Sequence, residues 1–268
     1  KILFMKDFIQ KKITALPQFS ADICEILNIF EKSNDDIIFA LTDSNYKSEI
    51  LNLANNHFLQ KNAIFKELKD ALNFYGKEEV KAFFLFAVFR KMLPNELTNY
   101  KIDAKNFTEI SLLRNALMFE WIQNFENVNA EILSTTILIE FSRIFIDELI
   151  TNLGVEISFY DEIKHCIFPT DFTDVEQKFT GVNREIVAAL LFKHFGLDKI
   201  ALYAKFSSII DDADEDIKKE CAMIKIVKTA VNIYHRLDER SIDNTLNLLD
   251  EHIFEQDAFV RSIKKLNL

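Results

Sequence analysis

Apolar residues recur at steps of three and four positions along most of this 268-residue chain. One such series is Phe19, Ile23, Ile26, Leu27 and Phe30, and another is Val80, Phe83, Phe84, Ala87 and Val88. This spacing places apolar side chains on one face of an α-helix, whereas a half-buried strand would alternate at every second residue. Similar series lie within 137–148 and 186–195, and no sustained alternation interrupts them. The pattern predicts an all-α fold.

Residues that break helices are rare, with only four glycines and three prolines, so we expect helices joined by short turns. The turn at Pro94-Asn95 divides the chain into an N-terminal helical lobe, 1–94, and a second lobe, 95–268, in which periodic helices begin near Ile110. The least periodic internal stretch, 157–180, is expected to be an ordered connection. The segment 95–109 is rich in apolar residues and lacks the composition of a flexible tether. The two lobes are therefore predicted to pack as one unit.

Charge and composition limit the function classes. The formal net charge is −10 and the sequence pI is about 5.1, which disfavours binding to nucleic acid because phosphate contacts need clustered Lys and Arg. No apolar run reaches the roughly 18 residues of a membrane span. The cysteines, Cys24, Cys166 and Cys221, are odd in number and widely spaced, so neither a disulfide framework nor a zinc site is indicated. A cytoplasmic protein without membrane insertion is expected.

Two histidines are candidates for chemistry. His194 and Asp198 are four positions apart. If they share a helix, this spacing can place both side chains on one metal ion, but two residues so spaced more often form a local hydrogen-bonded pair. His57 falls on the same predicted helix face as Ile50 and Leu53. A buried, hydrogen-bonded core histidine is the favoured interpretation of His57.

The acidic run Asp211–Asp216 resembles a calcium loop only superficially. Counted from Asp212, Ile217 stands where the loop requires glycine, and Met223 stands where it requires the bidentate glutamate. A solvated turn or helix start is the favoured interpretation, and no glycine-rich phosphate loop is present elsewhere.

Three segments carry a family resemblance through their order and spacing. They are ALPQF at 15–19, then Asp43 leading into EILNLANNHF at 49–58, then DALNFYGKEEVKAFFLFAVF at 70–89. Together they resemble the HDOD family, a relative of the HD metal-dependent phosphohydrolases that has usually lost the metal ligands. The resemblance implies an HD-domain-like multi-helical bundle of two packed lobes. The residues that carry the motif, expected to be structural, are Leu16, Pro17, Asp43, Leu53, Ala54, Asn55, Asn56 and Gly76.

The same resemblance implies that the catalytic metal site is absent. An HD site needs an adjacent His-Asp pair and further histidines, but none of the five histidines here precedes an aspartate. The first ligand histidine would fall near Asn115, the His-Asp pair on Ile139-Glu140, and a third histidine near Asn183. A further histidine pair would fall near Ser208 and Ile209. We expect no catalytic metal and no cofactor.

Three functions remain open on the sequence. The resemblance favours a non-catalytic regulatory or scaffold protein that contacts a protein partner in bacterial signal transduction. The alternative is a sensor that binds a nucleotide or another small ligand in the vestigial HD pocket, and a residual metal-dependent phosphohydrolase is the third possibility. The residues expected to line the vestigial pocket are Asn115, Glu140, Asn183, Arg114, Arg143 and Arg184.

Overall fold

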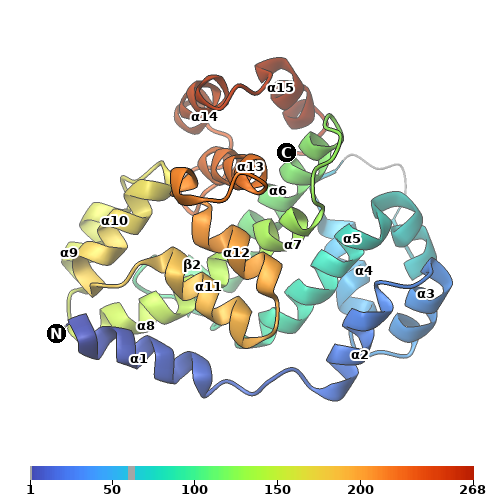
Figure 1. Ribbon diagram of the computed structural model, residues 1–268, viewed down its shortest axis with the longest axis horizontal. Coiled ribbons are helices and arrows are strands. Elements are labelled where there is room, and N and C mark those ends of the chain that lie inside the picture. Colours follow the sequence, from blue (N-terminus) through green and yellow to red (C-terminus); the bar gives the residue numbers. More distant parts are fainter. Residues whose placement is uncertain (1, 60–63) are drawn as a thin grey trace.

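The computed structural model describes residues 2–59 and 64–268, which are helical almost throughout (Figure 1). The N-terminal helices are α1 (Ile2–Thr14), α2 (Ala21–Ile29), α3 (Asn34–Thr42), α4 (Lys47–Asn56), α5 (Leu68–Phe89) and the 3-10 helix η1 (Arg90–Met92). Two short strands follow, β1 (Glu96–Leu97) and β2 (Ile102–Asp103). The remaining elements are α6 (Ala104–Ile122), α7 (Glu131–Leu138), η2 (Ile139–Ser142), α8 (Arg143–Leu153), α9 (Glu156–Ile163), α10 (Pro169–Thr180), α11 (Arg184–His194), α12 (Asp198–Phe206), η3 (Ile210–Asp212), α13 (Lys218–Ala230), α14 (Glu239–Glu251) and α15 (Gln256–Lys264). The predicted all-α fold is confirmed.

Glycine and proline mark several helix boundaries. Gly76 has φ 77° and ψ 169° and divides α5 at a kink, a positive-φ conformation that glycine adopts without steric cost. Gly154, at φ 65° and ψ 39°, ends α8 in the left-handed helical region. Pro169 is the first residue of α10, where its missing N–H costs no helical hydrogen bond. The few breakers therefore act as stops and kinks between closely packed helices.

The stretch 157–180 was expected to be a connection, and this expectation was wrong because it forms most of α9 and the whole of α10. The apolar period is hard to see in α10 because Thr173 and Glu176 face the interior beside Phe172. Polar residues on a buried helix face hide the pattern on which the prediction relied.

The C-terminal half of α5 forms the centre of the molecule. All residues from Val80 to Phe89 are buried, and α5 packs against α4 on one side and α7 on another (Figure 1). Its Phe89 ring meets Phe141 at 5.6 Å and Phe192 at 5.8 Å between centroids. One hydrophobic core thus contains side chains from both the 1–94 and the 95–268 groups.

The segment between these groups is docked onto the core. β1 and β2 pair in antiparallel fashion, with Glu96 opposite Asp103 and Leu97 opposite Ile102. Leu97, Tyr100, Ile102 and Phe107 are buried as expected. The side chain of Asp103 then accepts a hydrogen bond from the Asn106 N–H and caps α6.

The C-terminal helices close over α6. The indole of Trp121 packs against Phe254 and Phe259, at centroid distances of 5.2 and 4.9 Å. After α15, the Asn267 N–H donates to the Phe58 carbonyl at 2.6 Å, which ties the end of the described chain to the segment following α4. None of the helices that the structure describes is both long and apolar enough to cross a bilayer.

Candidate functional site

A buried ionic cluster lies where α6, η2, α8, α10, α11 and α13 meet. Its first centre is Glu140 in η2, which accepts from Nη1 of Arg114 at 2.8 Å and from Nε of Arg143. Nη1 of Arg184 lies 3.9 Å from the second Glu140 oxygen. These four side chains are at most 3% exposed, so protein groups rather than water solvate the carboxylate.

Glu176 in α10 is the second carboxylate of the cluster. It accepts from Nε of Arg184 at 2.8 Å, from the Tyr100 hydroxyl at 2.9 Å and from Nη1 of Arg143. The Arg143 guanidinium lies over the Tyr100 and Phe172 rings, with Cζ 4.9 Å from each centroid. Two aromatic rings and two carboxylates thus hold this guanidinium in place.

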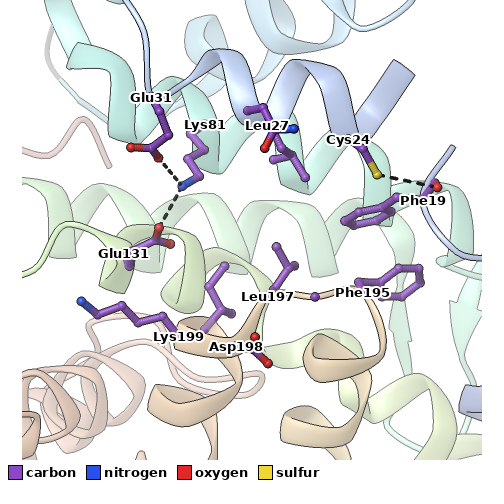
Figure 2. Close-up of a pocket in the computed structure, with 13 residues that line it drawn as sticks. Phe19, Cys24, Leu27, Glu31, Lys81, Glu131, Phe195, Leu197, Asp198 and Lys199 are labelled. Atoms are coloured by element: carbon purple, nitrogen blue, oxygen red, sulfur yellow. Dashed lines mark hydrogen bonds and ion pairs between the residues drawn. The ribbon is translucent and has the colours of Figure 1, made fainter. Parts of the chain in front are cut away.

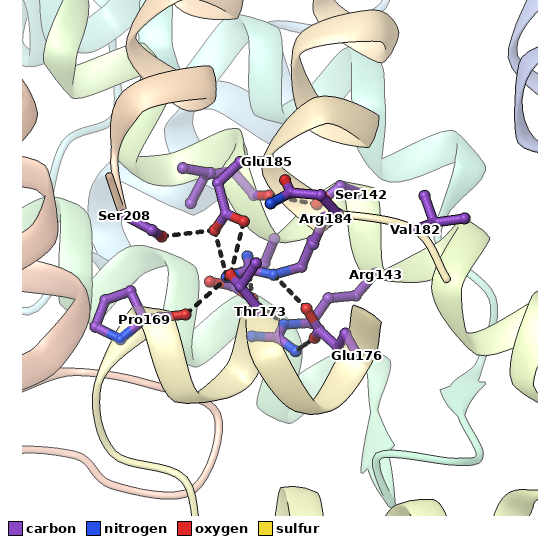
Figure 3. A network of polar contacts seen from close by, with 12 residues as sticks. Ser142, Arg143, Pro169, Thr173, Glu176, Val182, Arg184, Glu185 and Ser208 are labelled. Atoms are coloured by element: carbon purple, nitrogen blue, oxygen red, sulfur yellow. Dashed lines mark hydrogen bonds and ion pairs between the residues drawn. The ribbon is translucent and has the colours of Figure 1, made fainter. Parts of the chain in front are cut away.

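Glu185 in α11 is the third carboxylate (Figure 3). It accepts from Thr173 Oγ1 at 2.6 Å, Ser208 Oγ at 2.7 Å and Nη2 of Arg184 at 3.1 Å. Nζ of Lys228, from α13, lies 3.5 Å away. The cluster therefore joins residues that are far apart in the sequence through charge-assisted hydrogen bonds.

Burial and the surrounding charges set the ionisation of the cluster. Burial raises the pKa of Glu140, but Arg143, Arg114 and Arg184 outweigh it and hold the pKa well below its usual value. Burial opposes ionisation of Glu185 too, yet Arg184 and Lys228 bring its pKa to about 2. Burial and the neighbouring Arg184 lower the pKa of Lys228 to about 7. Near neutral pH Lys228 can therefore lose its proton. Burial raises the pKa of Glu176.

A second buried polar group lies on another side of α6. His57 Nε2 is 3.0 Å from Asn115 Oδ1 and 3.0 Å from Glu79 Oε1. Asn115 Nδ2 donates to the Leu133 carbonyl at 3.1 Å. Burial raises the pKa of Glu79. His57 itself is 3% exposed, so the prediction of a buried, hydrogen-bonded core histidine is confirmed.

The six residues expected at the vestigial pocket divide among three places. Arg114, Glu140, Arg143 and Arg184 meet in the ionic cluster. Asn115, the neighbour of Arg114 in sequence, lies instead with His57 and Glu79. Asn183 caps α11 by accepting from the Ile186 N–H at 3.0 Å, and it lines a cleft of about 450 Å³ between α1 and α11.

Other candidate residues have different surroundings from those their spacing suggested. His194 ends α11 and Asp198 begins α12, with Gly196 at φ 72° between them, so they do not share one helix. His194 Nε2 lies 3.0 Å from the Leu16 carbonyl. Sequence reasoning missed Glu176, Glu185 and Lys228, which complete the cluster. The one available sign was Lys228, a charged residue between the apolar positions of α13.

The side chains at the positions that the resemblance assigns to metal ligands do not fit a divalent cation. Glu140 already faces three guanidinium groups, which would repel a metal ion. The adjacent Ile139 is buried and offers no donor atom. Across residues 2–59 and 64–268, no three His, Cys, Asp or Glu side chains converge in a metal-holding group.

The fold has close counterparts among solved structures. An HDOD domain protein of unknown function from Geobacter sulfurreducens superposes with a TM-score of 0.68 at 14% identity, over 98% of this chain and 93% of that one. A candidate phosphohydrolase from Shewanella amazonensis gives 0.66 at 14% identity over 96% and 93%. A virulence factor from Campylobacter jejuni gives 0.54 at 11% identity over 96% of both chains. No protein-family model and no curated protein matches the sequence. The chain therefore has the HDOD/HD-like fold that its motifs predict.

Proposed function

We propose that this protein is a non-catalytic regulatory or scaffold domain that acts through protein contacts in bacterial signal transduction. The observation that supports this proposal is the ionic cluster around Glu140. The resemblance assigns Glu140 to the His-Asp pair of an HD enzyme, which needs metal ligands and an open coordination position there, whereas here the carboxylate pairs with arginines. Removal of a single partner from such a cluster leaves an uncompensated buried charge. The cluster is thus suited to hold helices together rather than to exchange ligands.

The closed packing also supports this proposal over a nucleotide sensor. The cluster side chains are at most 3% exposed, whereas a nucleotide pocket needs an opening of several hundred Å³. A ligand at this position would have to separate α10 and α11 and break the pairs of Glu176 with Arg184 and Arg143. No such rearrangement is required for a partner that binds the outer surface.

A hydrolysis assay on the purified chain tests the non-catalytic part. The substrates are bis-p-nitrophenyl phosphate and a cyclic dinucleotide, each assayed with added Mn²⁺, Fe²⁺ or Mg²⁺ and with EDTA as the control. We expect the same background rate in every condition. Metal-dependent turnover that EDTA abolishes and added metal restores would overturn the proposal.

The partner is sought in parallel by capture from native lysate on the immobilised chain, followed by mass spectrometry. Free chain should compete with the immobilised chain for a specific partner. The bound partner should also remain on the immobilised chain during washing at physiological salt. The absence of any competed protein from repeated captures would count against a scaffold role.

A further inference from the structure

Two clefts adjoin on the surface at the start of α12. The first, of about 440 Å³, lies between α2 and the α11–α12 turn, and the second, of about 660 Å³, lies between α12 and the start of α13. Asp198 and Lys199 line both, so the two clefts adjoin at these residues, and we call the pair of clefts the acidic groove. Its first half separates a helix of the 1–94 group from the turn of the 95–268 group (Figure 2).

Carboxylates outnumber cations along this groove. Glu31, Glu131, Asp198, Asp216 and Glu220 line it, against Lys81 and Lys199. Nζ of Lys81 lies 2.8 Å from Glu131 and 3.9 Å from Glu31, and Figure 2 shows it between them. Lys81 is therefore already engaged, whereas Asp198 and Asp216 are solvent-exposed. The groove presents a negative surface, in keeping with the net charge of −10.

Apolar side chains line the same groove. At the first cleft the Phe19 and Phe195 rings stack with centroids 4.5 Å apart, and Leu27 and Leu197 lie beside them (Figure 2). At the second cleft, Leu202 is 37% exposed. A ligand that fills the groove would therefore meet apolar contacts along its length and negative charge beside them.

We infer that the acidic groove binds a basic, amphipathic peptide segment of a protein partner. Lysine or arginine side chains of that segment pair with Asp198 and Asp216, and its apolar side chains pack on Phe195 and Leu202. Charge complementarity selects this occupant over nucleic acid or an acidic peptide, which the carboxylates would repel. The inference rests on the proposed function, since it names the chemistry of the partner and the surface that receives it.

Labelled synthetic peptides and the full chain test the inference by fluorescence anisotropy at physiological salt. The probe is a peptide of lysine and leucine whose leucines recur at steps of three and four, so that they share one face of a helix. One matched peptide has every lysine replaced by glutamate, and the other has every leucine replaced by serine. We expect saturable binding of the lysine–leucine probe, no binding of the glutamate peptide, and affinity for the lysine–serine peptide that is weaker by about tenfold.

Variants then locate the binding site. The double variant Asp198→Lys/Asp216→Lys should weaken probe binding by about tenfold, and Lys199→Glu should strengthen it severalfold. The matched control Asp174→Lys/Asp243→Lys makes the same charge change at exposed positions that line neither cleft, and it should stay within about twofold of the original affinity. Circular dichroism checks that each variant is folded.

Several results would overturn the inference. They are the absence of probe binding, equal weakening by both double variants, or binding that persists in Asp198→Lys/Asp216→Lys. Free spermidine that displaces the probe, while the lysine–leucine and lysine–serine peptides bind equally, would identify a polyamine site instead. Failure of these peptide tests leaves the non-catalytic proposal standing, whereas metal-dependent turnover in the hydrolysis assay removes that proposal without altering the peptide result.

Discussion

Nη1 of Arg114 in α6 donates to Oε1 of Glu140 in η2 at 2.8 Å, and neither side chain is more than 3% exposed. The contact joins residues 26 positions apart in the middle of the fold. Glu140 also faces Arg143 and Arg184, and together with Glu176 and Glu185 it balances the charge of three buried guanidinium groups. The stability of the fold should therefore depend on the Glu140 carboxylate.

Replacement of Glu140 by glutamine tests that dependence. The change keeps the shape of the side chain but leaves three buried arginines facing a neutral amide, so we expect the free energy of unfolding to fall by about 3–5 kcal/mol. Glu148→Gln is the control, because Glu148 pairs with Lys12 at the surface, and it should cost at most about 1 kcal/mol. Urea unfolding measures both. Equal small losses would show that the cluster does not depend on the Glu140 charge.

Lys228 should make stability depend on pH. Burial lowers its pKa in the folded protein to about 7, whereas an unfolded lysine titrates near 10.4. Between these values the unfolded state binds more protons, so stability rises with pH, by at most about 1.4 kcal/mol per pH unit. Below pH 7 the cost of the buried charge is fully present. Urea unfolding from pH 7 to 9 should show this rise relative to Lys228→Met, and parallel curves would contradict it.

The sequence predicted the helices better than it predicted the cluster. The apolar period indicated α2 and the C-terminal half of α5, because side chains one turn apart share a helix face. It failed in α10, where Thr173 and Glu176 are buried polar residues. The resemblance identified four cluster members, Arg114, Glu140, Arg143 and Arg184, but not Glu176, Glu185 or Lys228. Burial of the charges of these three depends on α10, α11 and α13 meeting in space, which local periodicity does not report.

Asn55 is expected to contribute to stability through one pair of hydrogen bonds. Its Nδ2 donates to the Phe65 carbonyl and its Oδ1 accepts from the Phe65 N–H, both at 2.8 Å. Asn55→Leu removes both and should lower the free energy of unfolding by about 1–2 kcal/mol. Within the described part of the chain, the Asn56 side chain donates to Asn52 of its own helix, so Asn56→Leu should change the free energy of unfolding by less than about 0.5 kcal/mol. An unchanged melting temperature for Asn55→Leu, with weaker partner binding, would assign the motif to recognition.

Limited proteolysis should leave the connection between the two helical groups intact. Leu97 and Tyr100 within it are buried, and the Asn99 N–H donates to Asp147 Oδ1 at 2.8 Å while its side chain donates to the Asp147 carbonyl at 2.8 Å. A protease needs an extended, accessible backbone, which this docked segment does not offer. We therefore expect trypsin and chymotrypsin to cut elsewhere first. We also expect the chain to unfold in one transition, because α5 and α7 share a core. The variant Asn99→Ala supplies the comparison, since loss of the side-chain hydrogen bonds to the Asp147 carbonyl and Thr151 should speed cutting at 95–109. Rapid cleavage of the unmodified chain there, giving two fragments that melt separately, would show that 1–94 and 95–268 are independent lobes.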